Sequence, residues 1–235
     1  MDKTKDFHLK QFSIIGGHSG MPVSTDGILL GAWANLLHAH SILDIGTGTG
    51  LLALMSAQRN PKAKIQAIDI DIDAVDAATI NIKNSPWSDR ITVEQDDITQ
   101  RQPNMNVEHI TCNPPYFNSG ETTQSQARAK ARHTLTLSHP ELLIACRAWL
   151  SDEGEASFIL PKAEGKAFLD LAQTLGWFIS RICEVNTTAT KPCHRMLIAL
   201  TRRDIDIEYS QLTIHENGQY SRDFIELTKD FYLKM

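Results

Sequence analysis

Residues 111–117, TCNPPYF, carry the side chains whose types and order most clearly suggest chemistry. Proline fixes φ and lacks an N–H, and the residue before it is kept out of the helical region. Asn113 is therefore expected on a stiff, extended turn that aims its carboxamide. The Asn113 oxygen and the Pro114 carbonyl can each accept one N–H, and Tyr116 after Pro115 can stack on a planar group. These four residues predict a catalytic turn for a planar, conjugated amine such as adenine N6, cytosine N4 or a glutamine amide.

A glycine-rich loop, DIGTGTGLLAL, precedes that turn in the chain, following one predicted strand and opening a helix. Gly46, Gly48 and Gly50 permit a tight turn and close approach of a ligand to the backbone. The spacing of Gly48, Gly50 and Ala53 matches a dinucleotide fingerprint, and Asp69 ends the next strand at the expected distance. These features alone fit both NAD and S-adenosylmethionine, since each carries an adenosine whose ribose suits a carboxylate.

Two further positions favour S-adenosylmethionine over NAD. Asp44 stands two residues before the first glycine, where it could meet the cofactor's ammonium group but would repel a pyrophosphate. Asp97, at the end of the third predicted strand, could accept from the adenine amine, with the Ile98 backbone N–H facing a ring nitrogen. Asp96 is the alternative to Asp97.

The elements that must position these residues alternate between strand and helix. Apolar runs and helical periodicity predict strands at 41–46, 63–70, 90–96, 107–112, 155–160, 177–185 and 195–202, and helices at 49–60, 73–84, 139–150, 162–176 and 220–233. This alternation predicts an α/β fold with an open, mostly parallel sheet covered by helices on both faces. The last two strands, without a helix between them, predict a hairpin at one sheet edge.

The composition excludes several classes of function. The 235 residues carry a net charge of −5, which is not the profile of a surface built entirely for a polyanion. The four cysteines lack metal-type spacing, so no metal site is expected, and a reduced, cytoplasmic setting is the simple interpretation. No signal-peptide core or membrane-spanning apolar run is present, so we expect no membrane association.

Contacts to a nucleic acid would need local basic clusters, because phosphates are bound mostly by Lys and Arg. One cluster follows the catalytic turn, and a second precedes the strand predicted at 195–202. They comprise Arg128, Lys130, Arg132 and His133 in the first, and Lys191, His194 and Arg195 in the second. Each residue could equally be a solvated surface charge.

Several motifs together resemble a known group. DIGTGTG plus NPPY is shared by amino-group methyltransferases with a Rossmann-like fold. The blocks STDGILLGAW, SPWSDRI, ARHT…LSHPELL and the terminal FYL resemble more narrowly the bacterial tRNA (adenine-N6)-methyltransferases that act on valine tRNA next to the anticodon. The resemblance covers nearly the whole chain.

This resemblance implies a class I methyltransferase fold with a seven-stranded sheet whose last strand is antiparallel. It implies S-adenosylmethionine as donor, and a tRNA adenine just 3′ of the anticodon as acceptor. By position, Asp44, Gly46, Gly48 and Gly50 would line the methionine end, Asp69 the ribose, Asp97 the adenine, and Asn113 to Tyr116 the target base. Thr25 and Asp26 would lie near the methionine moiety, or alternatively cap a helix.

We expect one domain over residues 1–235, with 1–22 as an N-terminal extension, and no DNA or obligate protein partner. Methylation of a glutamine amide in a protein partner such as a release factor is the main alternative. Enzymes of that kind carry a separate N-terminal helical domain, for which the roughly 40 residues before the glycine loop leave little room. An NAD-dependent oxidoreductase would leave NPPY unexplained, and a non-catalytic RNA-binding module would leave the cofactor motifs unexplained.

Overall fold

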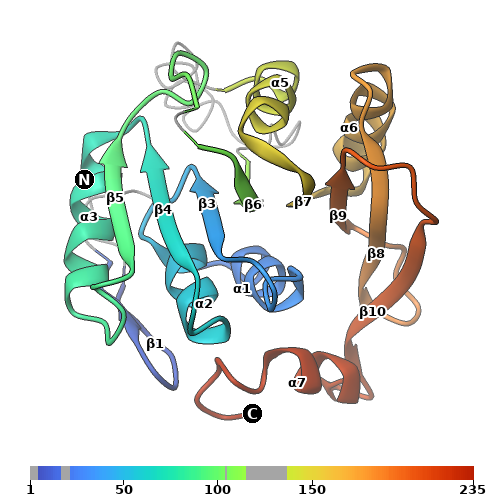
Figure 1. The fold of residues 1–235 in the computed structure, drawn as a ribbon. Helices are drawn as coiled ribbons and strands as arrows, with labels where there is room; N and C mark the ends of the chain where they lie inside the picture. The colour runs from blue at the N-terminus through green and yellow to red at the C-terminus, as the bar shows by residue number, and fades with distance from the viewer. Residues whose placement is uncertain (1–4, 17–21, 104, 115–136) are drawn as a thin grey trace, which may run out of the picture.

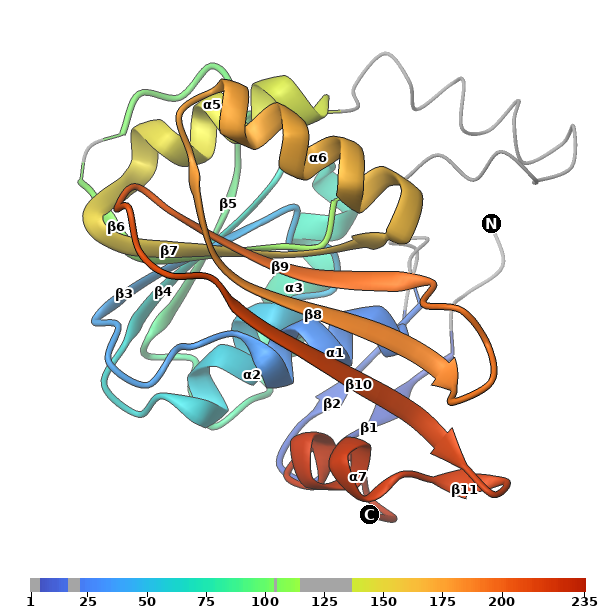
Figure 2. The ribbon, with the colours of Figure 1, turned by 90° about the vertical axis from the view of Figure 1, so that its right-hand side faces the viewer.

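A large twisted sheet with helices on both faces organises the molecule (Figures 1 and 2). The structure is a computed structural model that describes residues 5–16, 22–103, 105–114 and 137–235. Among these residues, nine strands form the sheet in the order β11-β10-β8-β9-β7-β6-β3-β4-β5, and β1 pairs with β2 in a separate hairpin. The mostly parallel α/β architecture with an antiparallel edge is therefore confirmed.

Each predicted strand and helix is present, and the structure adds β1, β2, α1, β10 and β11 to them. The strands are β1 Phe7–His8, β2 Ser13–Ile14, β3 Ser41–Ile45, β4 Lys64–Asp69, β5 Ile91–Gln95, β6 Val107–Cys112, β7 Leu150–Pro161, β8 Phe178–Thr188, β9 Arg195–Thr201, β10 Glu208–Glu216 and β11 Gln219–Tyr220. The helices are α1 Thr25–Trp33, α2 Leu51–Arg59, α3 Ile72–Lys83, α5 His139–Trp149, α6 Lys162–Thr174 and α7 Arg222–Thr228.

The prediction of seven strands is two short for the described sheet. The predicted hairpin exists, since β8 and β9 pair antiparallel, but it does not end the sheet. β10 adds to β8 in parallel, and β11 then pairs antiparallel with β10 at the margin. The extra strands come from residues 208–220, for which the sequence predicted no strand.

The two faces of the sheet bury separate apolar cores because side chains alternate along each strand. α5 and α6 cover one face and bury Trp149, Phe158 and Phe168. α1, α2 and α3 cover the other face (Figure 2). The β1–β2 hairpin joins this second core, where the Phe12 ring meets the Trp87 ring edge-on with centroids 5.8 Å apart.

The terminal segments of the chain hold one another. Leu9 forms an isolated bridge with Tyr232, and the Lys10 backbone N–H donates to the Phe231 carbonyl at 2.8 Å. The Lys10 ammonium donates to the Met235 carbonyl at 2.9 Å. The described part of the N-terminal extension is thus packed into the fold.

Candidate active site

The parallel strands β3, β4, β5 and β6 have their carboxyl ends on the same side of the sheet. The glycine loop and the NPPY segment begin there (Figure 1). The register pairs Ile45 with Cys112, the last residues of β3 and β6. Gly46 and Asn113 follow these two residues directly. The fold thereby brings together the two motifs that the sequence singled out, as expected for ligand sites in open α/β sheets.

The glycine loop requires glycine for its backbone shape. Gly46, Gly48 and Gly50 have φ of 68°, 57° and 83°, in the left-handed region where L side chains are strained. The N–H groups of Gly46 and Thr47 both donate to the Ile68 carbonyl, at 2.9 and 3.0 Å, which ties the loop to β4. A Cβ built on Gly46 or Gly48 would meet no atom of the described residues within 4 Å, so these residues leave open space above the loop.

Asp44 sits beneath this loop with no exposed surface. Its carboxylate accepts from the Thr47 hydroxyl at 2.6 Å, the Ala53 N–H at 3.2 Å and the Thr111 hydroxyl at 3.3 Å. These bonds join the glycine loop, the first turn of α2 and strand β6 through one side chain. The predicted contact with the methionine ammonium stays a prediction.

Burial raises the pKa of Asp44 from 3.8 to about 7. Because this folded-state pKa lies above the unfolded value, Asp44 adds most to the free energy of unfolding below about pH 4. That contribution falls as the pH rises toward 7, by about 4 kcal/mol in all. Asp44→Asn removes this ionisable group and with it the loss of stability at higher pH. We therefore expect the free energy of unfolding of the variant, relative to wild type, to rise between pH 5 and pH 8. Urea unfolding at pH 5 and pH 8 measures the free energy of unfolding of each protein. The same change between the two pH values in variant and wild type would contradict the prediction.

Asp69 ends β4 and supports the loop from the other side. Its Oδ2 accepts from the Gly48 N–H at 2.8 Å and its Oδ1 accepts from the Asp71 N–H at 3.0 Å. Burial raises the pKa of this half-buried carboxyl. Asp71 is the N-cap of α3, and its side chain accepts from the Asp73 N–H at 3.0 Å.

The two aspartates after β5 differ in how they are engaged. Asp96 accepts from the Asp97 N–H at 2.8 Å and from the Arg101 guanidinium at 2.9 Å, so both of its oxygens are engaged. Asp97 uses only Oδ1, which accepts from the Thr99 N–H and hydroxyl at 2.9 and 2.7 Å. Within the described residues its Oδ2 accepts no hydrogen bond. This difference favours Asp97 over Asp96 as a ligand group, beside the buried Ile98.

The side chain of Asn113 has an acceptor available to a ligand. Its side-chain oxygen is buried and accepts no hydrogen bond from the described residues. Leaving such an acceptor unsatisfied costs about 1–3 kcal/mol, a cost that a donor on a bound ligand would remove. Pro114 follows and is buried. Pro115, Tyr116, Arg128, Lys130, Arg132 and His133 lie outside the described residues.

Thr25 and Asp26 do not cap α1, which was one of the two roles predicted for them from the sequence. Ser24 is the N-cap, and its hydroxyl accepts from the Gly27 N–H at 3.1 Å. Thr25 hydrogen-bonds the side chain of Tyr232. The Asp26 carboxylate instead accepts from the Arg195 guanidinium at 2.7 Å, and both side chains are largely shielded from solvent. The helix-capping alternative was therefore wrong by one residue.

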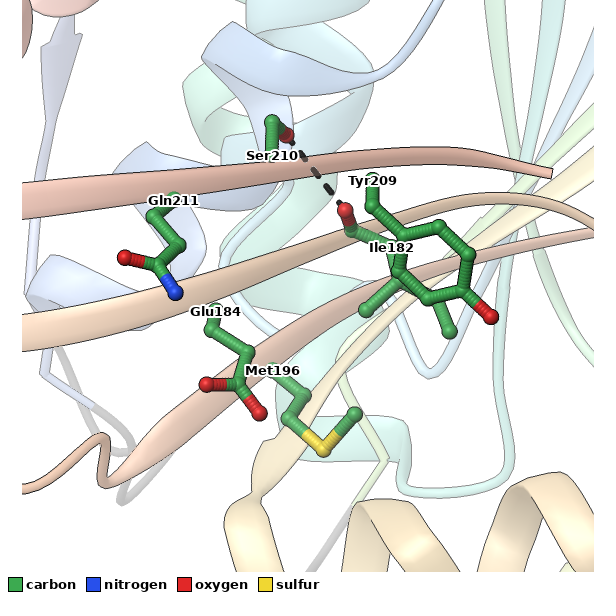
Figure 3. A pocket seen from close by; sticks show the side chains of 6 residues that line it. All are labelled: Ile182, Glu184, Met196, Tyr209, Ser210 and Gln211. Atoms are coloured by element: carbon green, nitrogen blue, oxygen red, sulfur yellow. Dashed lines mark hydrogen bonds between the residues drawn. The ribbon is translucent and has the colours of Figure 1, made fainter.

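A pocket elsewhere in the structure is unrelated to these motifs (Figure 3). It lies over the sheet extension, lined by Ile182, Glu184, Met196, Tyr209, Ser210 and Gln211. The Ser210 hydroxyl donates to the Ile182 carbonyl within it at 3.3 Å. No residue predicted to bind the cofactor or the base lines this pocket, which arises from the addition of β10 to β8.

The residues at the carboxyl ends of β3, β4, β5 and β6 fit the cofactor predicted from the sequence. The described residues leave space over two glycines. One carboxylate oxygen of Asp97 and the buried amide oxygen of Asn113 accept no hydrogen bond from the described residues, so both can accept from a ligand. Comparison with known proteins is consistent with this site. A family model for the methyltransferase small domain matches residues 25–148. The tRNA1(Val) (adenine(37)-N6)-methyltransferase of Vibrio campbellii is 53% identical over 233 residues, covering 99% of this chain and 98% of that protein.

The chain belongs to the tRNA1(Val) (adenine(37)-N6)-methyltransferase family. The Photobacterium profundum member is 49% identical over 238 residues, covering 98% of this chain and 99% of that protein. A solved predicted O-methyltransferase from Agrobacterium tumefaciens superposes with a TM-score of 0.70 at 18% identity, covering 88% of this chain and 96% of that one. That likeness shows the class I methyltransferase fold.

In this member of the tRNA1(Val) (adenine(37)-N6)-methyltransferase family, sequence reasoning missed Thr111 and Asn81. Thr111 binds Asp44 from β6, and Asn81 binds the glycine loop from α3. Neither belongs to a recognisable motif, and only the pairing of distant segments reveals them. Within the described ranges, no group of three or more His, Cys, Asp or Glu could hold a metal ion, and no helix is long and apolar enough to cross a bilayer.

Proposed function

We propose that this methyltransferase transfers the methyl group of S-adenosylmethionine to the exocyclic N6 of adenine 37 in valine tRNA, just 3′ of the anticodon. The names of its full-length relatives support the substrate. The observation that carries the chemistry is the buried, unsatisfied side-chain oxygen of Asn113 at the carboxyl end of β6. An amine N–H is the donor that this oxygen lacks.

The chain's part in the reaction is to hold a weak nucleophile. An exocyclic adenine amine is poorly nucleophilic because its lone pair is delocalised into the ring. The Asn113 oxygen and the Pro114 carbonyl would each accept one N–H, which fixes the nitrogen and favours the positive charge that develops on it. The cofactor supplies an electrophilic methyl group when bound. The neutral amide of Asn113 also avoids the competing attraction that a carboxylate would exert on the sulfonium.

The site residues proposed for each ligand follow from these positions. For the cofactor they are Thr25, Asp44, Gly46, Gly48, Gly50, Asp69, Asp97 and Ile98, and for the target base Asn113, Pro114, Pro115 and Tyr116. For the RNA backbone we propose Arg128, Lys130 and Arg132. For the second cluster we propose Arg195, whose guanidinium also donates to Asp26, together with its exposed neighbours Lys191 and His194. The proposed setting is the cytoplasm.

Glutamine methylation would use the same two acceptors, so an experiment must separate the two substrates. Purified protein is incubated with methyl-labelled S-adenosylmethionine and valine tRNA lacking the modification, and the digested RNA is analysed for nucleosides. We expect label in N6-methyladenosine, and none when adenine 37 is replaced by guanine. Label on another base, or on a release factor added in parallel but not on RNA, would overturn the proposal.

A further inference from the structure

Asn81 is a fully buried amide outside the proposed ligand-binding set. It lies on α3 with 1% of its surface exposed. Its Nδ2 donates to the Thr49 carbonyl at 2.9 Å and to the Ile15 carbonyl at 3.4 Å, while its Oδ1 accepts from the Ile15 N–H at 2.8 Å. One side chain therefore binds both the glycine loop and the N-terminal segment, 66 residues away along the chain.

The bond to Thr49 acts on the strained part of the loop. Thr49 lies between Gly48 and Gly50, both of positive φ, and its own side chain is buried. Asp69 holds the neighbouring Gly48 N–H, so two successive parts of the loop are fixed by side chains from α3 and the end of β4. Without this support, a loop with three left-handed residues would sample other conformations. The free-energy cost of ordering it on binding would then lower the affinity for a ligand.

The bonds to Ile15 act on the segment that leads into α1. Ile14 is buried in the core, whereas the Ile15 side chain is 44% exposed, and the N–H and the carbonyl of Ile15 both hydrogen-bond to Asn81. The next residue, Gly16, donates its N–H to Asp6 at 2.9 Å. The position of this segment beside the loop thus depends on the Asn81 amide more than on the packing of the Ile15 side chain.

We propose that Asn81 is a positioning residue that couples the N-terminal segment to the glycine loop, so that cofactor affinity and the order of that segment depend on one another. The inference rests on the proposed function in one respect: the glycine loop is the cofactor loop. Coupling of this kind is reciprocal, so a ligand that orders the loop also orders Ile15. Asn81 does not touch the cofactor or the acceptor in this account.

The test replaces Asn81 by Asp, which keeps an acceptor for the Ile15 N–H but removes the donor to Thr49 and sets an oxygen against its carbonyl. The probe is S-adenosylhomocysteine, the demethylated product, titrated by calorimetry. Hydrogen exchange of the Ile15 amide is followed with and without the probe. We expect the probe to slow Ile15 exchange in the wild type. In Asn81→Asp we expect this slowing to disappear and Kd to rise about 10-fold, as for loss of one buried hydrogen bond.

Asn60 provides a matched control. It is 2% exposed, donates to the Leu36 and Ala39 carbonyls at 2.6 and 2.7 Å, and lies at the opposite end of α2 from the loop. Asn60→Asp should lower stability without changing Kd or the effect of the probe on Ile15. Asn81→Ser, which adds no charge, serves if Asn81→Asp does not fold.

The outcomes separate the coupling from general destabilisation. An unchanged Kd in the Asn81 variants, or an equal change in Asn60→Asp, would overturn the inference, as would probe-dependent slowing that persists at Ile15. Because the measurements need no acceptor, failure of the tRNA assay would refute the proposed substrate and leave the role of Asn81 standing.

Discussion

Replacing Asn113 by alanine is expected to reduce the rate of methyl transfer by at least about 10²–10³-fold, the effect of removing one preorganised acceptor from a polar catalytic site. The loss should appear in kcat, because the amide acts on the acceptor nitrogen as charge develops there. Alanine also removes the buried, unsatisfied oxygen, so the variant should be no less stable than the wild type. Thermal unfolding checks this second point.

Asn113→Asp separates geometry from charge. It preserves the shape and an acceptor, but its negative charge would compete for the cofactor's sulfonium. We expect S-adenosylhomocysteine, which lacks that charge, to bind both variants within about threefold of wild type, a difference of less than 1 kcal/mol. Single-turnover assays with valine tRNA give the transfer rate, and calorimetry gives the affinity. If Asn113→Ala weakened cofactor binding as much as transfer, the residue would be structural.

The sequence was most informative where the backbone itself dictates residue type. Gly46, Gly48 and Gly50 were predicted as a tight loop, and each has a positive φ. The buried strand β3 and the helix α2 that flank this loop have strong apolar patterns, so their positions were predictable as well. Asn113 could be placed at a strand end because prolines follow it, and β6 does end at Cys112.

Strand β10 could not be predicted because its pattern is weak. Residues 208–216 read EYSQLTIHE, and only Leu212 and Ile214 are buried, while the first half of the strand is exposed. Such a strand gains much of its stability from backbone pairing with β8, which periodicity does not reveal. The same absence of local pattern explains why the count of strands was two short.

Contacts between distant segments were the other limit. Asp26 and Arg195 are 169 residues apart, and only the fold shows that their side chains hydrogen-bond to each other. Nothing in the sequence indicated that Asp44 accepts from Thr47, Thr111 and the Ala53 N–H. A carboxylate's partners depend on strand register, which follows from the whole sheet and not from any short stretch.

Replacing Gly48 by alanine should weaken cofactor binding by at least about 10-fold. Gly48 has φ of 57°, and a left-handed alanine costs about 1–2 kcal/mol, which by itself corresponds to roughly 5- to 30-fold if the loop relaxes away from its binding shape. The new methyl group would also enter the space above the loop, where no atom of the described part of the chain lies within 4 Å of the Cβ position. Calorimetric titration with S-adenosylhomocysteine measures the affinity.

Gly218 supplies the control that isolates this effect from backbone strain. It has φ of 77°, a Cβ there would also meet nothing within 4 Å, and it lies in the turn between β10 and β11. Gly218→Ala should therefore lower the free energy of unfolding by a similar amount while leaving the cofactor Kd unchanged. Equal affinities in the two variants would mean that the space above Gly48 is not used by the cofactor. A loss confined to Gly48→Ala would locate the cofactor at this loop without reference to any acceptor, because binding is measured before a substrate is added.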